Sequence, residues 1–287
     1  MPFIGFLYCI QSLYSLNKFY TLFALAFPFF LFAQQTPLSI EPASLIEPGY
    51  AQTGLGISYL HNQGFPLSGL TGNLYKLGNI RFSIALSEYV ELQTEGTLLD
   101  LLYVQNRKPA FNSSIASTNN PTGDIGDFSL WTKFAILREY RSGVALSIKF
   151  GAQLPNASNE SGLGIDEMNF YSSFLIEKHL GGLLIANVGL GILSDPTKVG
   201  SQHDVCMYGI RYVLPVGSST FAIVQYAGRA GHSGVGVNGL RSWKTGIEES
   251  FGDITMRVSA IKNNSIDDKA IGAECMIMYL FHAIEIP

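Results

Sequence analysis

The chain has 287 residues, of which 47% are hydrophobic, 14% are charged and 30 are glycine. This charged fraction lies well below the ~25% of a typical soluble domain, so the composition argues against an ordinary soluble protein. The 18 basic and 22 acidic residues give a formal net charge of −4. Nucleic acid is therefore not an expected partner, because binding to its phosphates requires a basic surface.

The N-terminus has the pattern of a secretory leader. Lys18 is the one charged residue of the first 33, and the apolar run Phe19 to Phe32 follows it, ending in the small residue Ala33. A positive region, an apolar region and a small-residue cleavage site predict that residues 1–33 are a cleaved signal peptide. A membrane-anchoring helix is the alternative; Pro28 within the run and Ala33 at its end favour cleavage.

After the leader, the chain divides into twelve segments that alternate polar and apolar residues, separated by glycine, proline, serine or asparagine. No stretch outside the leader reaches the ~18 uninterrupted apolar residues of a membrane helix. Most segments are long enough for the ~9 to 11 residues that a tilted strand needs to cross a bilayer. The predicted strands are Gln52–Leu60, Leu74–Leu86, Tyr89–Thr97, Asp127–Leu137, Val144–Leu154, Met168–Lys178, Leu183–Leu193, Val205–Leu214, Thr220–Gly228, Leu240–Glu248, Ile254–Ile261 and Gly272–Phe281.

The connections between these segments alternate between long and short. A long first loop, His61–Asn73, is followed by the tight turn Ser87–Glu88, and then by the longest loop, Leu98–Gly126, which we expect to fold inward as a constriction. Outer-membrane barrels have this parity, with short turns on the periplasmic side. We therefore predict an all-β fold: a transmembrane antiparallel up-and-down β-barrel of about twelve strands, over residues 50–287, in the bacterial outer membrane. Residues 34–49 are predicted to be a periplasmic N-terminal segment.

Charged residues at alternate positions of apolar strands predict the lumen. In GVALSIKFGAQLP, Lys149 shares the polar face of its strand with Gln153, whereas Ile148 and Phe150 lie on the apolar face. A charge facing lipid costs ~2 to 4 kcal/mol at the bilayer midplane, so Lys149 is expected to face the lumen and to reach Glu91, Glu95, Glu177 or water. The predicted lumen-lining residues are Arg81, Glu91, Gln93, Glu95, Lys133, Lys149, Gln153, Glu177, Asn187 and Arg257.

One predicted strand breaks the alternation. Trp131 and Leu137 share the face of Lys133. The sequence leaves two interpretations open: a partly filled lumen, or an interfacial position for Trp131.

The last predicted strand ends in Tyr279-Leu280-Phe281. An aromatic residue, any residue and a phenylalanine resemble the C-terminal signal by which outer-membrane barrels are recognised for insertion. Tyr279 and Phe281 are thus the predicted insertion signal, and the barrel-insertion machinery is a predicted partner. In the signal, the phenylalanine is the last residue. Here His282 to Pro287 follow Phe281, so the chain departs from the pattern.

The segment from Thr122 to Ile192 resembles a bacterial outer-membrane family labelled for the MetA pathway of phenol degradation, whose members are transporter-like barrels. The matching features are Gly126-Asp127, the strand of Lys133, the strand end Leu154-Pro155, the loop Gly162-Leu163-Gly164 and the strand of Asn187-Val188-Gly189. The resemblance implies an outer-membrane barrel and is the source of an expected link to aromatic compounds. It transfers no catalytic residue.

The remaining polar residues predict no enzyme. Ser201 and Ser233 adjoin His203 and His232, but these pairs lie in polar loops where such neighbours arise by chance. The loop acids Asp124, Asp127, Asp166 and Glu167 lack the spacing of a calcium loop and are expected to be solvated. No catalytic residue, metal site or cofactor is predicted.

Passive passage of small solutes, aromatic or otherwise hydrophobic compounds among them, is the predicted function, with outer-membrane lipid and the solute as partners. A non-conducting structural or surface-interaction barrel that acts through its outer loops is the alternative. A secreted soluble β-protein is a third hypothesis, which the strand lengths and the loop parity disfavour.

Overall fold

The computed structural model describes residues 40–111, 115–164, 166–195, 198, 200–231, 238–265 and 267–285. The predicted signal peptide, residues 1–33, lies outside the described residues, and so do His232 and Ser233.

The described chain is almost entirely β-structure. Its helices are α2 (Glu139–Ser142) and the 3-10 turn η2 (Asn159–Ser161). In the described part of the chain, no helix is long and apolar enough to cross a membrane. The strands are β1 (Tyr50–Phe65), β2 (Leu70–Ala85), β3 (Val90–Arg107), β4 (Thr122–Asp124), β5 (Ser129–Leu137), β6 (Ala145–Gln153), β7 (Asn169–His179), β8 (Leu183–Ser194), β9 (Gln202–Pro215), β10 (Thr220–Gly231), β11 (Arg241–Phe251), β12 (Ile254–Asn263) and β13 (Ile271–His282).

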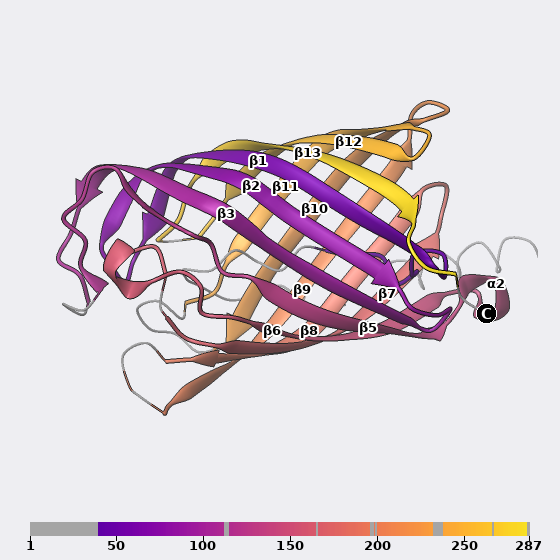
Figure 1. The fold of residues 1–287 in the computed structure, drawn as a ribbon, viewed down its shortest axis with the longest axis horizontal. Coiled ribbons are helices and arrows are strands. Elements are labelled where there is room, and N and C mark those ends of the chain that lie inside the picture. Colours follow the sequence, from indigo (N-terminus) through magenta and orange to yellow (C-terminus); the bar gives the residue numbers. More distant parts are fainter. Residues whose placement is uncertain are drawn as a thin grey trace, which may run out of the picture. The chain divides into compact units, whose positions relative to one another are not determined.

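The strands form a closed antiparallel barrel. Each long strand pairs with the next along the chain, and β1 pairs with β13 over Tyr50–His61, which closes the sheet. The short β4 lies outside this circuit and pairs only with β3. Figure 1 shows the strands running obliquely, with β1, β2 and β3 side by side. All twelve predicted strands are therefore confirmed, and so is the up-and-down order.

Two predicted loops are wrong in part, because strands continue into them. Residues 61–65 extend β1 and residues 70–73 begin β2, so the first connection contains only residues 66–69. Similarly, β3 continues to Arg107 and takes up the first third of the predicted loop Leu98–Gly126. The glycines in the first stretch suggest a loop, but at Gly72 a Cβ would lie 2.1 Å from the Tyr103 carbonyl oxygen. Glycine there permits close strand pairing.

The two faces of the sheet differ as the period of two predicts. Along β8, Val188, Leu190 and Ile192 are exposed on the outward face, and the same holds for Phe134 and Phe150 on neighbouring strands. Charged and polar side chains occupy the inward face, where Glu91, Lys133 and Lys149 are each less than a tenth exposed. Apolar side chains outside and buried charges inside are the reverse of a soluble protein and match a barrel surrounded by lipid.

Trp131 lies inside the barrel, so the interpretation as a partly filled lumen holds. Its side chain is 3% exposed, and its ring centroid lies 4.2 Å from Lys149 Nζ. Leu137 does not share this face, because the pairing of β5 with β6 shifts between Ala135 and Leu137 and leaves Leu137 exposed. A bulge of this kind changes which side of a strand the next residue faces.

Val224 tests the outward face, because it lies near the middle of β10 with half of its surface exposed. We expect Val224→Arg to lower the free energy of unfolding in phospholipid vesicles by about 2 to 4 kcal/mol, the cost of an arginine near the midplane. Phe251→Arg, at the end of β11, is the control and should cost about 0 to 1 kcal/mol. Equal effects in a guanidinium titration would contradict a lipid-facing belt.

Candidate functional site: an occluded lumen

Two lysines lie directly opposite each other on the inward face. The pairing of β5 with β6 places Lys133 beside Lys149, and the pairing of β3 with β5 places Glu91 on the other side of Lys133. Like charges at directly opposed positions are destabilising, and burial increases the cost. Lys133 Nζ lies 3.2 Å from Glu91 Oε1. The sheet thus provides a carboxylate for Lys133, and Lys149 needs another.

Glu41 supplies the second carboxylate, from a segment that precedes the barrel. Its Oε1 lies 2.9 Å from Lys149 Nζ and 3.7 Å from an Arg81 nitrogen, and the side chains of Glu41 and Lys149 are 6% and 7% exposed. None of the partners predicted for Lys149 is the one that the structure gives it. Residues 34–49 were expected in the periplasm, whereas the described part, Ile40–Gly49, packs against lumen-facing side chains; we call this part the plug segment.

The backbone of the plug segment is bound along its length by inward side chains. Lys133 Nζ donates to the Ser44 carbonyl oxygen at 3.1 Å, and Ser147 Oγ donates to the Ala43 carbonyl oxygen at 2.5 Å. In the other direction, the Ile46 N–H donates to Glu91 at 2.8 Å, and both the N–H and hydroxyl of Ser44 donate to Glu177. A buried backbone must have its polar groups satisfied. Here the side chains of the inward face satisfy the backbone of the segment, as a neighbouring strand would in a sheet.

Apolar contacts fix the inner end of the plug segment. Ile40 is 2% exposed and packs with Ile185 of β8 and Ala227 of β10. A Cβ at Gly209 would lie 1.9 Å from Ile40 Cδ1, so a side chain there would displace the isoleucine. Ala43 packs similarly against Ala145 and Leu175. The segment therefore fits the interior by shape as well as by charge.

At its outer end, the plug segment is joined to the end of the barrel that carries the short turns. The Gly49 N–H donates to the Ala85 carbonyl oxygen, and the Gly49 carbonyl oxygen accepts from the N–H groups of Ala283 and Ile284. Gly49 has a φ of +84°, a conformation that favours glycine. The chain turns there from the lumen into β1.

Beyond the plug segment, in the half of the barrel toward the long loops, lies a cavity of about 350 Å³. Its lining combines ion pairs with aliphatic side chains. Lys76 pairs with Asp100 at 3.0 Å and Arg81 with Glu95 at 2.8 Å. The other ion pairs around it are Lys244 with Glu274 and Arg257 with Glu248. The aliphatic lining includes Leu60, Leu74, Leu163, Ile223, Leu240 and Ile261.

Loops from the long-loop end bound this cavity. In the predicted constriction loop, Thr122–Asp124 pair with β3 as β4, and Thr122 Oγ1 donates to the Ser161 carbonyl oxygen at 2.7 Å. Asp127 accepts from the Asn156 and Ala157 N–H groups and from Gln153. Asp127 is thus an organising residue of the loop and not the solvated acid that we predicted. Its burial raises the pKa of its carboxyl group.

The structure places every predicted lumen residue on the inward face or against the plug segment. Arg81, Glu95, Gln153 and Arg257 line the cavity. Gln93 donates to Glu91 at 2.6 Å, and Glu177 holds Ser44 as described above. The Asn187 side-chain amide faces the Glu41 backbone, with distances of 3.0 Å to its N and O when the amide is oriented to bond to both.

The predicted insertion signal lies on the last strand. Tyr279 and Phe281 stack with ring centroids 5.7 Å apart, and Tyr279 is exposed. Both belong to β13 near its C-terminal end. Their role in insertion stays a prediction.

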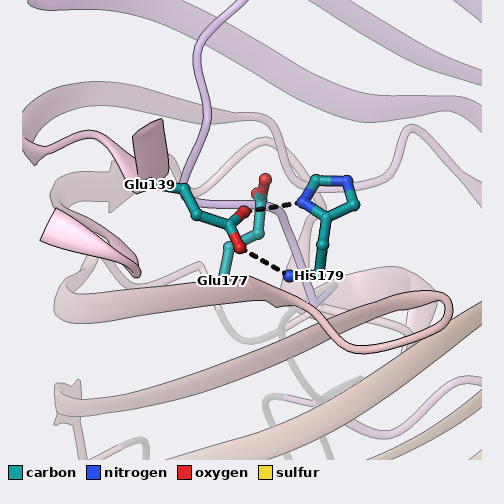
Figure 2. A group of neighbouring side chains, drawn as sticks. All are labelled: Glu139, Glu177 and His179. Atoms are coloured by element: carbon teal, nitrogen blue, oxygen red, sulfur yellow. Dashed lines mark hydrogen bonds and ion pairs between the residues drawn. The ribbon is translucent and has the colours of Figure 1, made fainter. Parts of the chain in front are cut away.

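One group of described residues could hold a metal ion. Glu139, Glu177 and His179 each bring a ligand atom within 4.8 Å of the others, and Figure 2 shows the imidazole and the Glu139 carboxylate facing each other. All three already have protein partners: His179 Nδ1 lies 2.6 Å from Glu139 Oε2, and Glu177 binds Ser44. The hydrogen bond from His179 lowers the pKa of Glu139. In this arrangement the group ties α2 to β7 and to the plug segment.

The closed sheet, its apolar outward face and its charged interior together define a membrane-spanning β-barrel with an internal plug segment. No family model matches the sequence and no curated protein matches it, so the MetA-pathway label stays a prediction. In fold the chain is similar to the COG4313 outer membrane channel from Pseudomonas putida F1, with a TM-score of 0.60 and 14% identity over 85% of this chain and 100% of that one.

Two further solved structures are more distant. The translocator domain of the autotransporter NalP from Neisseria meningitidis gives a TM-score of 0.44 and 11% identity, over 80% of this chain and 87% of that one. A loop-deletion mutant of OmpT from Vibrio cholerae gives a TM-score of 0.42 and 9% identity, over 81% of this chain and 98% of that one. At these levels the COG4313 comparison establishes a shared barrel fold, and the other two add nothing to it.

Glu41 is the test of how the plug segment is held. Removing one partner of a buried ion pair costs about 3 to 5 kcal/mol, so Glu41→Gln should weaken docking by about 3 kcal/mol. This corresponds to roughly a 100-fold gain in exposure of the segment. Thiol labelling of Leu45→Cys, in a background with Cys206→Ser and Cys275→Ser, measures that exposure.

Glu47→Gln is the matched control, because Glu47 belongs to the same segment and is exposed. It should leave the labelling rate unchanged. If Glu41→Gln labelled no faster than this control, the ion pair with Lys149 would not be what holds the segment.

Gly209 gives an independent test through shape. Because a side chain there would overlap Ile40, Gly209→Val should increase labelling at Leu45→Cys even though all charges remain. Overpacking typically costs 1 to 3 kcal/mol, which predicts a rate increase of about 5- to 150-fold. An unchanged rate would mean that Ile40 does not anchor the segment.

Proposed function

We propose that this protein is a passive channel of the bacterial outer membrane for small solutes, and that the plug segment Ile40–Gly49 controls its opening. The short-turn end, where Gly49 meets Ala85 and Ala283, is then the periplasmic end. The observation that carries the proposal is the docking of the plug segment across the lumen through Glu41, which contacts Arg81 of β2 and Lys149 of β6.

The character of the contacts supports a removable closure over a permanent one. Apolar contacts are confined to Ile40 and Ala43, and the ion pair and hydrogen bonds of the rest of the segment can be exchanged for water when it leaves. The residues uncovered by its departure, among them Lys133, Lys149 and Glu177, would then line a charged, water-accessible passage. Polar lumen walls of this kind are typical of barrels that conduct solutes.

The cavity supports passage of solutes with an apolar part. Aliphatic side chains such as Leu60, Leu74 and Ile261 share its lining with ion pairs. A volume of about 350 Å³ falls in the range of sites for small organic molecules. The expectation of aromatic or otherwise hydrophobic solutes is consistent with this lining and stays part of the proposal.

Single-channel recording of the refolded chain from Gln34 to Pro287 tests the proposal. The intact chain should show small or rare conductance steps in planar bilayers, and a variant lacking residues 34–47 should show steps several-fold larger. Both proteins must first show the heat-modifiable migration of a folded barrel. If the shortened barrel inserts and does not conduct, the channel proposal fails, and the alternative of a structural barrel acting through its outer loops takes its place.

Lys149 tests which side chains face the open passage. In the shortened barrel, Lys149→Gln removes a cation from the wall and should shift the reversal potential toward cation selectivity. Lys262→Gln is the control, because Lys262 is exposed on β12. If both variants had the reversal potential of the parent, Lys149 would not face the passage.

A further inference from the structure

One cation of the cavity differs from the others. Lys76, Arg81, Lys244 and Arg257 each lie within 3.0 Å of a carboxylate oxygen. Arg211 of β9 lines the same cavity and is 9% exposed. Its hydrogen-bond partner is a neutral side chain: its Nε and one terminal nitrogen donate to Gln225 Oε1, at 2.9 and 2.7 Å.

Among the described residues, no carboxylate oxygen lies within 4.0 Å of the Arg211 guanidinium. A guanidinium has five N–H donors, and only two of those of Arg211 are used by Gln225. Burying a cation without a counter-charge is costly unless something else compensates for it. The arrangement leaves one positive charge and several donors available to a molecule in the cavity.

The surroundings of Arg211 on its own side of the barrel are apolar. Ile223 and Ala227 flank Gln225 on the same face of β10 and are 5% and 1% exposed. Farther toward the long loops, the cavity meets a cluster that contains Leu60, Leu74 and Ile261. The cavity thus has a cationic point deep in the barrel, and its walls toward the long-loop end combine aliphatic side chains with the ion pairs described above.

We propose that the cavity binds a singly charged organic anion, with its carboxylate or other oxyanion head on Arg211 and its apolar body against the aliphatic walls. One head group fits, because a single cation among the described lining residues has no carboxylate partner. A fork of N–H donors matches the two oxygens of a carboxylate. This inference rests on the proposed function and names the class of solute that the channel would take.

Isothermal titration of the refolded, full-length barrel in detergent tests the assignment with octanoate and 1-octanol. Octanoate should bind, and Arg211→Gln should weaken its binding at least tenfold, whereas weak binding of octanol should not change. Arg211→Lys keeps the charge and loses the forked donor geometry. Its octanoate affinity should lie between that of the parent and that of Arg211→Gln. Equal octanoate affinity in the parent and Arg211→Gln proteins would overturn the proposal, as would octanoate binding no tighter than octanol in the parent.

A double variant, Arg138→Gln with Glu88→Gln, is the control. It removes an ion pair that does not line the cavity, without changing the net charge, and octanoate affinity should stay within about threefold. A purely structural role for Arg211 predicts the reverse of our expectation: Arg211→Gln would lower the heat-modification temperature and leave octanoate binding intact. Because binding is measured without a membrane, a barrel that failed to conduct could still pass this test, so the two proposals fail separately.

Discussion

The interior of this barrel is organised by a conflict between two positive charges. Strand register puts Lys133 and Lys149 side by side on the inward face, and neither can turn outward, because the other face is covered with side chains such as Phe134 and Phe150 that suit lipid. Glu91 neutralises one lysine. The second is neutralised by Glu41, which the sheet does not contain, so Lys149 has its carboxylate partner only when the plug segment is inside.

This dependence gives the lumen two different halves. Around the plug segment, charged side chains of the wall bind a segment of the same chain. In the cavity beyond it, wall cations are matched with wall acids, as in the pairs of Lys76 with Asp100 and Lys244 with Glu274. Arg211 departs from that rule with the neutral Gln225 as its partner. Arg211 lies in the cavity that a solute would occupy before it met the plug segment. In a channel, its charge would be available to that solute.

The barrel itself was predictable because each strand carries its own signal. Alternation such as that around Lys149 indicates strand, face and environment at once, and the same rule found the inward residues from Arg81 to Arg257. The plug segment carries no such signal: Ile40 to Gly49 is short and irregular, and its contacts are with residues as far along the chain as Ile284, 235 positions after Gly49. One signal was available in the sequence. Glu41 is an acidic residue shortly before the first strand, and it could have been considered as a partner for the inward-facing Lys149. The ends of β1 and β2 were missed for another reason, since Gly64 and Gly72 suggest a loop. A Cβ at these positions would lie 2.1 Å from the carbonyl oxygens of Asp267 and Tyr103, so close backbone contacts favour glycine at both.

The hydrogen bonds of Gly49 to residues 283 and 284 place the root of the plug segment at the seam where β1 meets β13. That seam joins the first strand to the last, so it cannot exist before the final strand has been added. Without that seam, the segment lacks the hydrogen bonds from Ala283 and Ile284, and the bond of Gly49 to Ala85 is what remains of its root. The strand that closes the wall is therefore also the strand that completes the anchorage of the plug segment.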